Sequence, residues 1–268
     1  KRLINCFASF IKLTHSLPND CKILHINSEA EIITSTSTND ESMNFHEFET
    51  NYLNGISCLL MSRGFAGIKT KIYIDSEVFN LKFDQELKCI ILFNQFYSAF
   101  GSFTKLKRLN DCYDNLISII AGHNYIPFGG AVVDRLNLIT QTNADDLLSR
   151  QTNYIPINDI ICLTFNGENV FALSKVFQID DSNLEEKLYH LKHELKPNYD
   201  ETIAIVFSLK IGNAIDQIKK VFFHFKIRII GICGCVHGVN SHESNIKSNV
   251  FNLKNHCTII IIQLRKKV

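Results

Sequence analysis

The sequence lacks an excess of charge, a long apolar run and a secretory leader. Its 28 lysine and arginine residues are balanced by 27 aspartate and glutamate residues, which leaves a formal net charge of +1. Such a balance provides no global positive field to collect nucleic acid or an acidic membrane, so we expect neither as a partner. The longest apolar candidate, residues 258–264, is strand-sized, whereas a membrane-spanning helix needs roughly 18 or more residues. No apolar signal-peptide block follows Lys1, and a start on lysine suggests a fragment of a longer chain.

The cysteines do not form the pattern of a disulfide framework. The chain has nine of them, an odd number, and several lie inside apolar runs, for example Cys58, Cys89 and Cys162. A free cysteine in such a run behaves as a small hydrophobic side chain that faces a core. Disulfide scaffolds are short, loop-rich and secreted, which this chain is not. We therefore expect a reducing, intracellular compartment, the cytoplasm or the nucleus.

No motif for a phosphate-bearing cofactor occurs. Neither G-x-x-x-x-G-K-[ST] nor G-x-G-x-x-G opens a helix in the chain, and we expect no cofactor. With 46% hydrophobic and 21% charged residues, the chain can nevertheless bury a sizeable core, which excludes wholesale disorder.

Two stretches of the chain repeat the same order of elements. Each begins with two strands separated by a turn and continues with a strand, a helix and a glycine-ended strand. In the first stretch these elements are residues 55–62, 67–74, 88–94, 104–120 and 125–133. In the second they are residues 159–165, 169–178, 202–208, 213–225 and 227–233, with an inserted helix at 183–195. The near-constant spacing of matching elements predicts a duplicated unit, and the alternative is a chance match of generic patterns.

The repeat predicts an α/β fold of two similar units of mixed β-sheet. A strand–helix–strand segment forms a right-handed crossover between parallel strands, and the preceding strand pair makes each sheet mixed. Asn166-Gly167 predicts a tight hairpin turn inside the second unit. Helices cover one face of each sheet, so the other apolar faces should pack together in layers, α-β-β-α. Outside the repeat we expect a helix at 3–17, a strand at 21–27 that pairs with 31–34, and a last strand at 256–264.

Glycines close the last strand of each unit and precede polar loops. Ligands of open α/β sheets bind at the carboxyl ends of strands, and glycine lets a ligand or another backbone approach closely. The candidate ligand- or substrate-binding residues are Gly129, Gly130, Asp134, Arg135, Gly231, Gly234 and His237. In the alternative the glycines only turn the chain where two sheets meet, and Asp134 and Arg135 form an exposed ion pair.

The segment with Cys233, Cys235 and His237 allows two sharper interpretations. A metal site could use these residues with His242 and Cys257, although structural zinc sites prefer C-x₂₋₄-C spacing with a second matching pair. Alternatively, Cys233 or Cys235 could be a nucleophile with His237 as its base, and Cys235 could meet His237 because side chains two apart on a strand point the same way. The sequence assigns no third group to orient that pair. We therefore expect no metal and no catalytic residue, and a strand that ends in a glycine-rich turn.

Five short segments occur in a characteristic order along the chain. They are LPNDCKILHI (17–26), PFGGAVVDRL (127–136), DIICLTFNG (159–167), GICGCVHG (231–238) and CTIIIIQL (257–264). Their order and spacing resemble the FIST domain of F-box and intracellular signal transduction proteins, from about Leu17 to the C-terminus. The resemblance implies residues 1–20 as an N-terminal helix or linker, 21–124 as a first FIST-like unit and 125–268 as a second, FIST C unit.

The same resemblance implies a role in protein recognition. The chain would be the non-catalytic, substrate-binding part of an F-box type SCF ubiquitin ligase receptor in ubiquitin-dependent degradation, with protein substrates as partners. The Skp1–cullin complex would bind through an F-box that is missing from this chain, since strand patterns and not helical ones follow residues 17–20. The alternatives are a small-ligand sensor, as in bacterial FIST sensory domains, and, less favoured, a cysteine- or metal-dependent enzyme.

Overall fold

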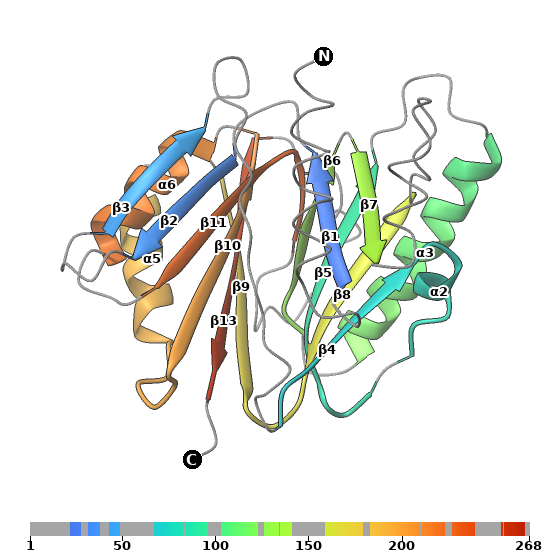
Figure 1. Ribbon diagram of the computed structural model, residues 1–268, viewed down its shortest axis with the longest axis horizontal. Coiled ribbons are helices and arrows are strands. Elements are labelled where there is room, and N and C mark those ends of the chain that lie inside the picture. Colours follow the sequence, from blue (N-terminus) through green and yellow to red (C-terminus); the bar gives the residue numbers. More distant parts are fainter. Residues whose placement is uncertain are drawn as a thin grey trace.

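The computed structural model arranges the chain in four layers, with two β-sheets packed between two layers of helices (Figure 1). The predicted α-β-β-α architecture of two packed sheet units is therefore confirmed. The structure describes residues 22–27, 32–37, 43–48, 67–82, 84–95, 103–122, 126–133, 135–140, 159–178, 183–209, 211–222, 227–238, 253 and 255–265.

One sheet has five strands, and two helices cover its outer face. The strands are β4 (Lys69–Ile74), β5 (Leu87–Gln95), β6 (Phe128–Val133), β8 (Ile160–Asn166) and β12 (Cys235–Gly238). The helices are α2 (Ser76–Phe79) and α3 (Phe103–Gly122). The spatial order is β12-β6-β5-β8-β4, so β4 and β12 lie at its edges.

The other sheet has six strands and is covered by two further helices. The strands are β2 (Ile32–Ser37), β3 (Met43–Phe48), β9 (Val170–Gln178), β10 (Glu201–Ser208), β11 (Arg228–Cys233) and β13 (His256–Leu264). The helices are α5 (Leu184–His193) and α6 (Ile211–Phe222). The spatial order is β3-β2-β11-β10-β13-β9, and a separate ribbon pairs β1 (Lys22–Asn27) with β7 (Arg135–Thr140).

The two sheets repeat one pairing pattern. In the five-stranded sheet β5 and β6 are parallel and joined by α3, β8 lies antiparallel between β4 and β5, and β12 pairs antiparallel with β6. In the six-stranded sheet β10, β11, α6, β13, β9 and β2 take the corresponding places. Matching Gly130 to Gly231 also matches Phe93 to Phe207, and these rings meet edge to face with centroids 5.9 Å apart. The contact joins equivalent positions of the two units.

The core consists of three apolar layers. The central layer lies between the sheets and takes Ile91 and Phe93 from one and Ile205, Phe207 and Ile260 from the other. The two outer layers lie under the helices, one below α2 and α3 and one below α5 and α6. Each sheet is thus apolar on both faces, which explains why β8 is buried along its whole length.

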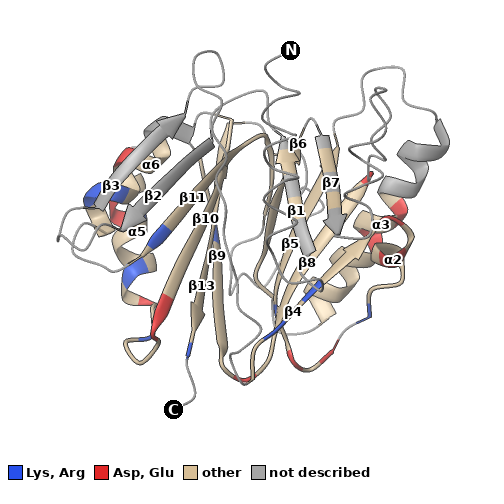
Figure 2. Cartoon of the chain, in the orientation of Figure 1, with Lys and Arg blue, Asp and Glu red and all other residues tan. Residues whose placement is uncertain are grey.

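The helices follow the apolar spacing of their sequences. On α6 the buried residues Ala214, Ile215, Ile218, Val221 and Phe222 recur at the period of one helical face. In Figure 2 charged residues lie mainly along the outer helices and at strand ends, whereas the facing strands are largely uncharged. No helix in the ranges given above combines the length and apolar character of a membrane span.

The prediction of a hairpin at Asn166-Gly167 is wrong, because β8 and β9 do not pair with each other. Strand β8 has both edges occupied, by β4 and β5, so β9 cannot pair with it and instead forms an edge of the six-stranded sheet. The turn therefore carries the chain from one sheet to the other. Gly167 has a φ of +114°, and a Cβ there would lie 1.9 Å from the Gly67 carbonyl oxygen, so the turn requires glycine.

The expected pairing of residues 21–27 with 31–34 is also wrong. β2 pairs with β11 on one side and with β3 on the other, so it has no free edge for β1, which pairs with β7 instead. The helix expected at 3–17 and the strand expected at 55–62 lie outside the described residues. Each sheet takes strands from both sides of residue 125, and the division of the chain at that residue stays a prediction.

Candidate functional site

Four of the candidate residues come together where the two sheets join. Gly129 and Gly130 lie on β6, and the register of the adjacent strand β12 places His237 opposite Gly130. Gly234 lies where the chain leaves β11 in the six-stranded sheet and enters β12 in the five-stranded one. Its backbone N–H donates to the carbonyl oxygen of Ser208 at 3.2 Å.

The remaining candidate residues do not join this group. Gly231 lies on β11, between Val206 of β10 and Ile33 of β2, at the place in the second unit that Gly130 takes in the first. Arg135 begins β7 opposite Asn27, and its side chain is not among those that the structure describes. Asp134 lies outside the described residues.

Protein atoms occupy the space beside the clustered glycines. A Cβ on Gly130, whose φ is +158°, would lie 1.8 Å from the carbonyl oxygen of Leu92 on the neighbouring strand. A Cβ on Gly234 would lie 2.3 Å from the carbonyl oxygen of Val132. Both glycines thus let one backbone approach another closely. Their assignment as ligand-binding residues stays a prediction.

Two further glycines let the sheets touch. A Cβ on Gly129 would lie 2.8 Å from Cγ2 of Thr258 on β13, and a Cβ on Gly238 would lie 2.3 Å from Oγ1 of the same residue. Nearby, the Phe128 backbone N–H donates to the buried Ser174 Oγ of β9 at 3.2 Å. These contacts connect β6 and β12 of one sheet with β9 and β13 of the other.

His237 lies on the opposite face of β12, below α3. Its fully buried Nε2 donates to Oδ1 of Asn94 on β5, and the two atoms are 2.5 Å apart. The imidazole must cross β6 to reach β5, and Gly130, which carries no side chain, lies opposite His237 on that strand. The Tyr113 ring of α3 packs edge to face on the imidazole, with the ring centroids 5.8 Å apart. Burial lowers the pKa of His237 to about 3, so the ring is neutral near pH 7.

This arrangement supplies the orienting group that the sequence did not reveal, but it does not complete a catalytic set. A base held by an asparagine is one part of a cysteine–histidine mechanism. Cys235 is only partly buried, and its thiol makes no hydrogen bond to His237, although both side chains are described. The geometry therefore gives His237 a packing and hydrogen-bonding role between β12, β5 and α3.

The other thiols of this region are buried in separate surroundings. Cys233 donates from Sγ to the Leu209 carbonyl oxygen at 3.4 Å. Cys257 on β13 lies across Ser208 from Cys233, and burial raises the pKa of its thiol to about 12. His242 lies outside the described residues, and within the described ranges no group of histidine, cysteine and acidic side chains is arranged to hold a metal ion.

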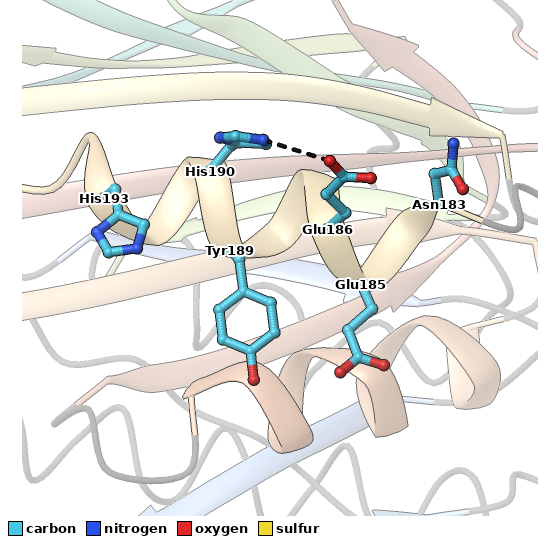
Figure 3. Close-up of a pocket in the computed structure, with 6 residues that line it drawn as sticks. All are labelled: Asn183, Glu185, Glu186, Tyr189, His190 and His193. Carbon is cyan, nitrogen blue, oxygen red and sulfur yellow. Dashed lines mark ion pairs between the residues drawn. The ribbon is translucent and has the colours of Figure 1, made fainter.

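An open depression of a different character lies on the outer helix α5. It has a volume of about 600 Å³ and is lined by Asn183, Glu185, Glu186, Tyr189, His190 and His193. Figure 3 shows Tyr189 and Glu185 pointing toward α6, whereas Glu186 and His190 lie on the other side of α5. The sequence predicts this helix as an insertion in the second unit and does not single out its exposed face. The one local signal is a tyrosine on the polar face of an amphipathic helix.

The chain matches no protein-family model, and no curated protein matches it in sequence.

Proposed function

We propose that this chain is a FIST-like, non-catalytic recognition domain that binds protein substrates for an F-box type SCF ubiquitin ligase. The contact with the Skp1–cullin complex would be made by an F-box outside this chain. The domain would act in the cytoplasm or the nucleus, where a reducing environment suits its free thiols.

One observation carries the proposal. His237 and the clustered glycines near the strand ends are used in packing, since His237 is fully buried against Asn94 and the glycines lie against backbone or side-chain atoms. The outer faces of both sheets are covered by helices, so the helical surfaces face the surroundings. Exposed side chains on such helical surfaces can dock a protein partner.

The order of the five segments supports the FIST-like assignment. Four of them coincide with strands of the two packed sheets. These strands are β6, β8, β13 and the end of β11 together with β12. The first segment covers all of β1 except Asn27, and the partner strand β7 begins at Arg135 within the second segment. Short motifs far apart in the sequence thus belong to one connected framework.

Co-purification tests this function. The complete protein, with whatever sequence precedes this chain, should bring down Skp1 and cullin, whereas the chain alone should not. The chain alone should capture the same substrate proteins and, when overproduced, should slow their ubiquitylation by competition. A complete protein that does not co-purify with Skp1 would contradict the proposal.

A further inference from the structure

We propose that the exposed face of α5 docks a basic, arginine-bearing segment of a partner protein. This α5 surface consists of Asn183, Glu185, Glu186, Tyr189, His190 and His193. The inference rests on the proposed function, because it names the surface and the chemistry by which a protein substrate would be recognised.

The helix separates its packing face from this surface. Leu184, Leu188 and Leu191 are buried against the six-stranded sheet, at the spacing of one helical stripe. The corresponding connection in the other unit is α2, a helix of only four residues (Ser76–Phe79) that buries Val78. The longer α5 therefore adds an outward-facing surface to the second unit.

Tyr189 gives this surface an apolar centre. It is 43% exposed and is one of two large hydrophobic side chains that stand out among the described residues, the other being Leu209. Interface contacts of high energy are enriched in tyrosine, because its ring offers a large area at small entropic cost. An open depression around such a ring suits a chain segment better than an enclosed small molecule.

The two glutamates of the surface differ in their partners. Glu185 pairs with Lys220 of α6, with Oε2 and Nζ 2.6 Å apart. Glu186 lies 3.8 Å from His190 Nε2, an ion pair that exists only while the imidazole is protonated, and its side chain is 70% exposed. Within the described ranges no lysine or arginine lies at ion-pair distance from Glu186. Its carboxylate is therefore available to a cation from outside.

The chemistry of these groups selects arginine. A guanidinium binds a carboxylate through two parallel hydrogen bonds, whereas a lysine ammonium is a point charge without this fork geometry. A segment that crosses α5 could place an arginine on Glu186 and an apolar neighbour on Tyr189, which lie on the two sides of the helix (Figure 3). An acidic segment would instead meet the carboxylate of Glu186, which has no lysine or arginine partner among the described residues.

Binding of a short fluorescent peptide that contains arginine and leucine tests the inference with the whole chain. Tyr189→Ala should weaken binding about tenfold, and Glu186→Gln about threefold. His190→Lys should weaken it as Glu186→Gln does, because a lysine four residues after glutamate occupies the carboxylate while it supports the helix. Asp111→Asn, which removes an exposed carboxylate from α3, should leave binding unchanged. Each variant should keep the unfolding temperature of the parent chain.

Two results would overturn the inference. One is equal binding of the same peptide with every arginine replaced by glutamate, and the other is unchanged binding by Tyr189→Ala and Glu186→Gln. If the chain still captured its substrate proteins in that case, the docking surface would be wrong and the proposed function would stand. If the peptide bound through Tyr189 and Glu186 while the complete protein ignored Skp1, the ligase function would be wrong and the surface would stand.

Discussion

At the scale of single residues, glycines bring backbones together and a histidine spans the gap that one of them leaves. Gly130 is the clearest case, because a Cβ would fall 1.8 Å from the Leu92 carbonyl oxygen. Because Gly130 has no side chain, the imidazole of His237, which lies opposite it, can pass over β6. The sequence points to such glycines through their clustering but not to the atoms that they approach.

The first prediction concerns that glycine. Gly130→Ala should lower the free energy of unfolding by about 3 kcal/mol, since the strands must separate to admit the methyl group. Gly122→Ala is the matched control, because no atom lies within 4 Å of a Cβ at the end of α3. The control should change stability by less than about 1 kcal/mol, toward a more stable helix. Urea unfolding of both variants measures the difference, and equal effects would contradict the packing role of Gly130.

The second prediction concerns the pH dependence of stability. The folded pKa of His237 is about 3, below the ordinary value of 6.5, so the unfolded chain binds the proton more readily. The stabilisation is complete above about pH 6.5 and declines as pH falls toward 3, with a slope that approaches about 1.4 kcal/mol per pH unit. His237→Gln should remove this part of the slope between pH 6.5 and 4.5. Chemical unfolding across that range, compared between variant and parent, measures it, and identical slopes would contradict the buried neutral imidazole.

At the scale of elements, the sequence predicts strands and helices better than it predicts their neighbours. The strand expected at 256–264 has the bounds of β13, and α5 and β10 begin within a residue of their expected starts. Periodicity reports which face of an element is buried and not which strand lies beside it. The Asn166-Gly167 turn therefore suggested a hairpin, although β8 already had two neighbours in its own sheet.

The candidate site shows the same limit. The segment around Gly234 and His237 is visible as a cluster in the sequence, but Asn94 is 143 residues away from His237 and has no local signal. Contacts of this kind depend on register between strands, which follows from the whole sheet. The α5 surface is difficult to predict for a different reason, since one tyrosine on the polar face of a helix does not distinguish a docking surface from an ordinary solvent-exposed face.

The third prediction tests the contact between the two sheets. Gly238→Ala should lower the free energy of unfolding by about 2 kcal/mol, because the new methyl group meets the Thr258 side chain. The double variant Gly238→Ala, Thr258→Ala should lose less free energy of unfolding than the sum of the two single variants, with a coupling energy of about 1–2 kcal/mol. Thr202→Ala is the control, because Thr202 lies at the end of β10 away from Thr258. Its effect on the free energy of unfolding should add to that of Gly238→Ala without coupling. Additive effects at Gly238 and Thr258 would contradict direct packing of β12 on β13.

At the scale of the whole molecule, the sandwich buries five of the six described cysteines together with its core. Burial raises the thiol pKa of Cys112 and Cys257 to about 12, and that of Cys89 and Cys162 further still. Cys235 is the one partly exposed cysteine among the six that the structure describes. The unfolding of the protein should therefore control the reactivity of most of these thiols.

The fourth prediction follows from that burial. Brief alkylation of the native protein should modify Cys235 among the described cysteines, while Cys89, Cys112, Cys162 and Cys257 should react only in denaturant. Peptide mass spectrometry identifies the modified positions, and Cys235→Ser supplies the control. Rapid native modification of Cys89 or Cys162 would be incompatible with the central and outer core layers.

We propose that this chain selects proteins for ubiquitin-dependent degradation, and the half-life of the selected proteins reports that role. The decisive measurement is the half-life of the proteins that the chain captures, in cells with and without the complete protein. These half-lives should lengthen when the complete protein is removed, and restoring it with Tyr189→Ala should only partly shorten them. Unchanged half-lives of all captured proteins would contradict it.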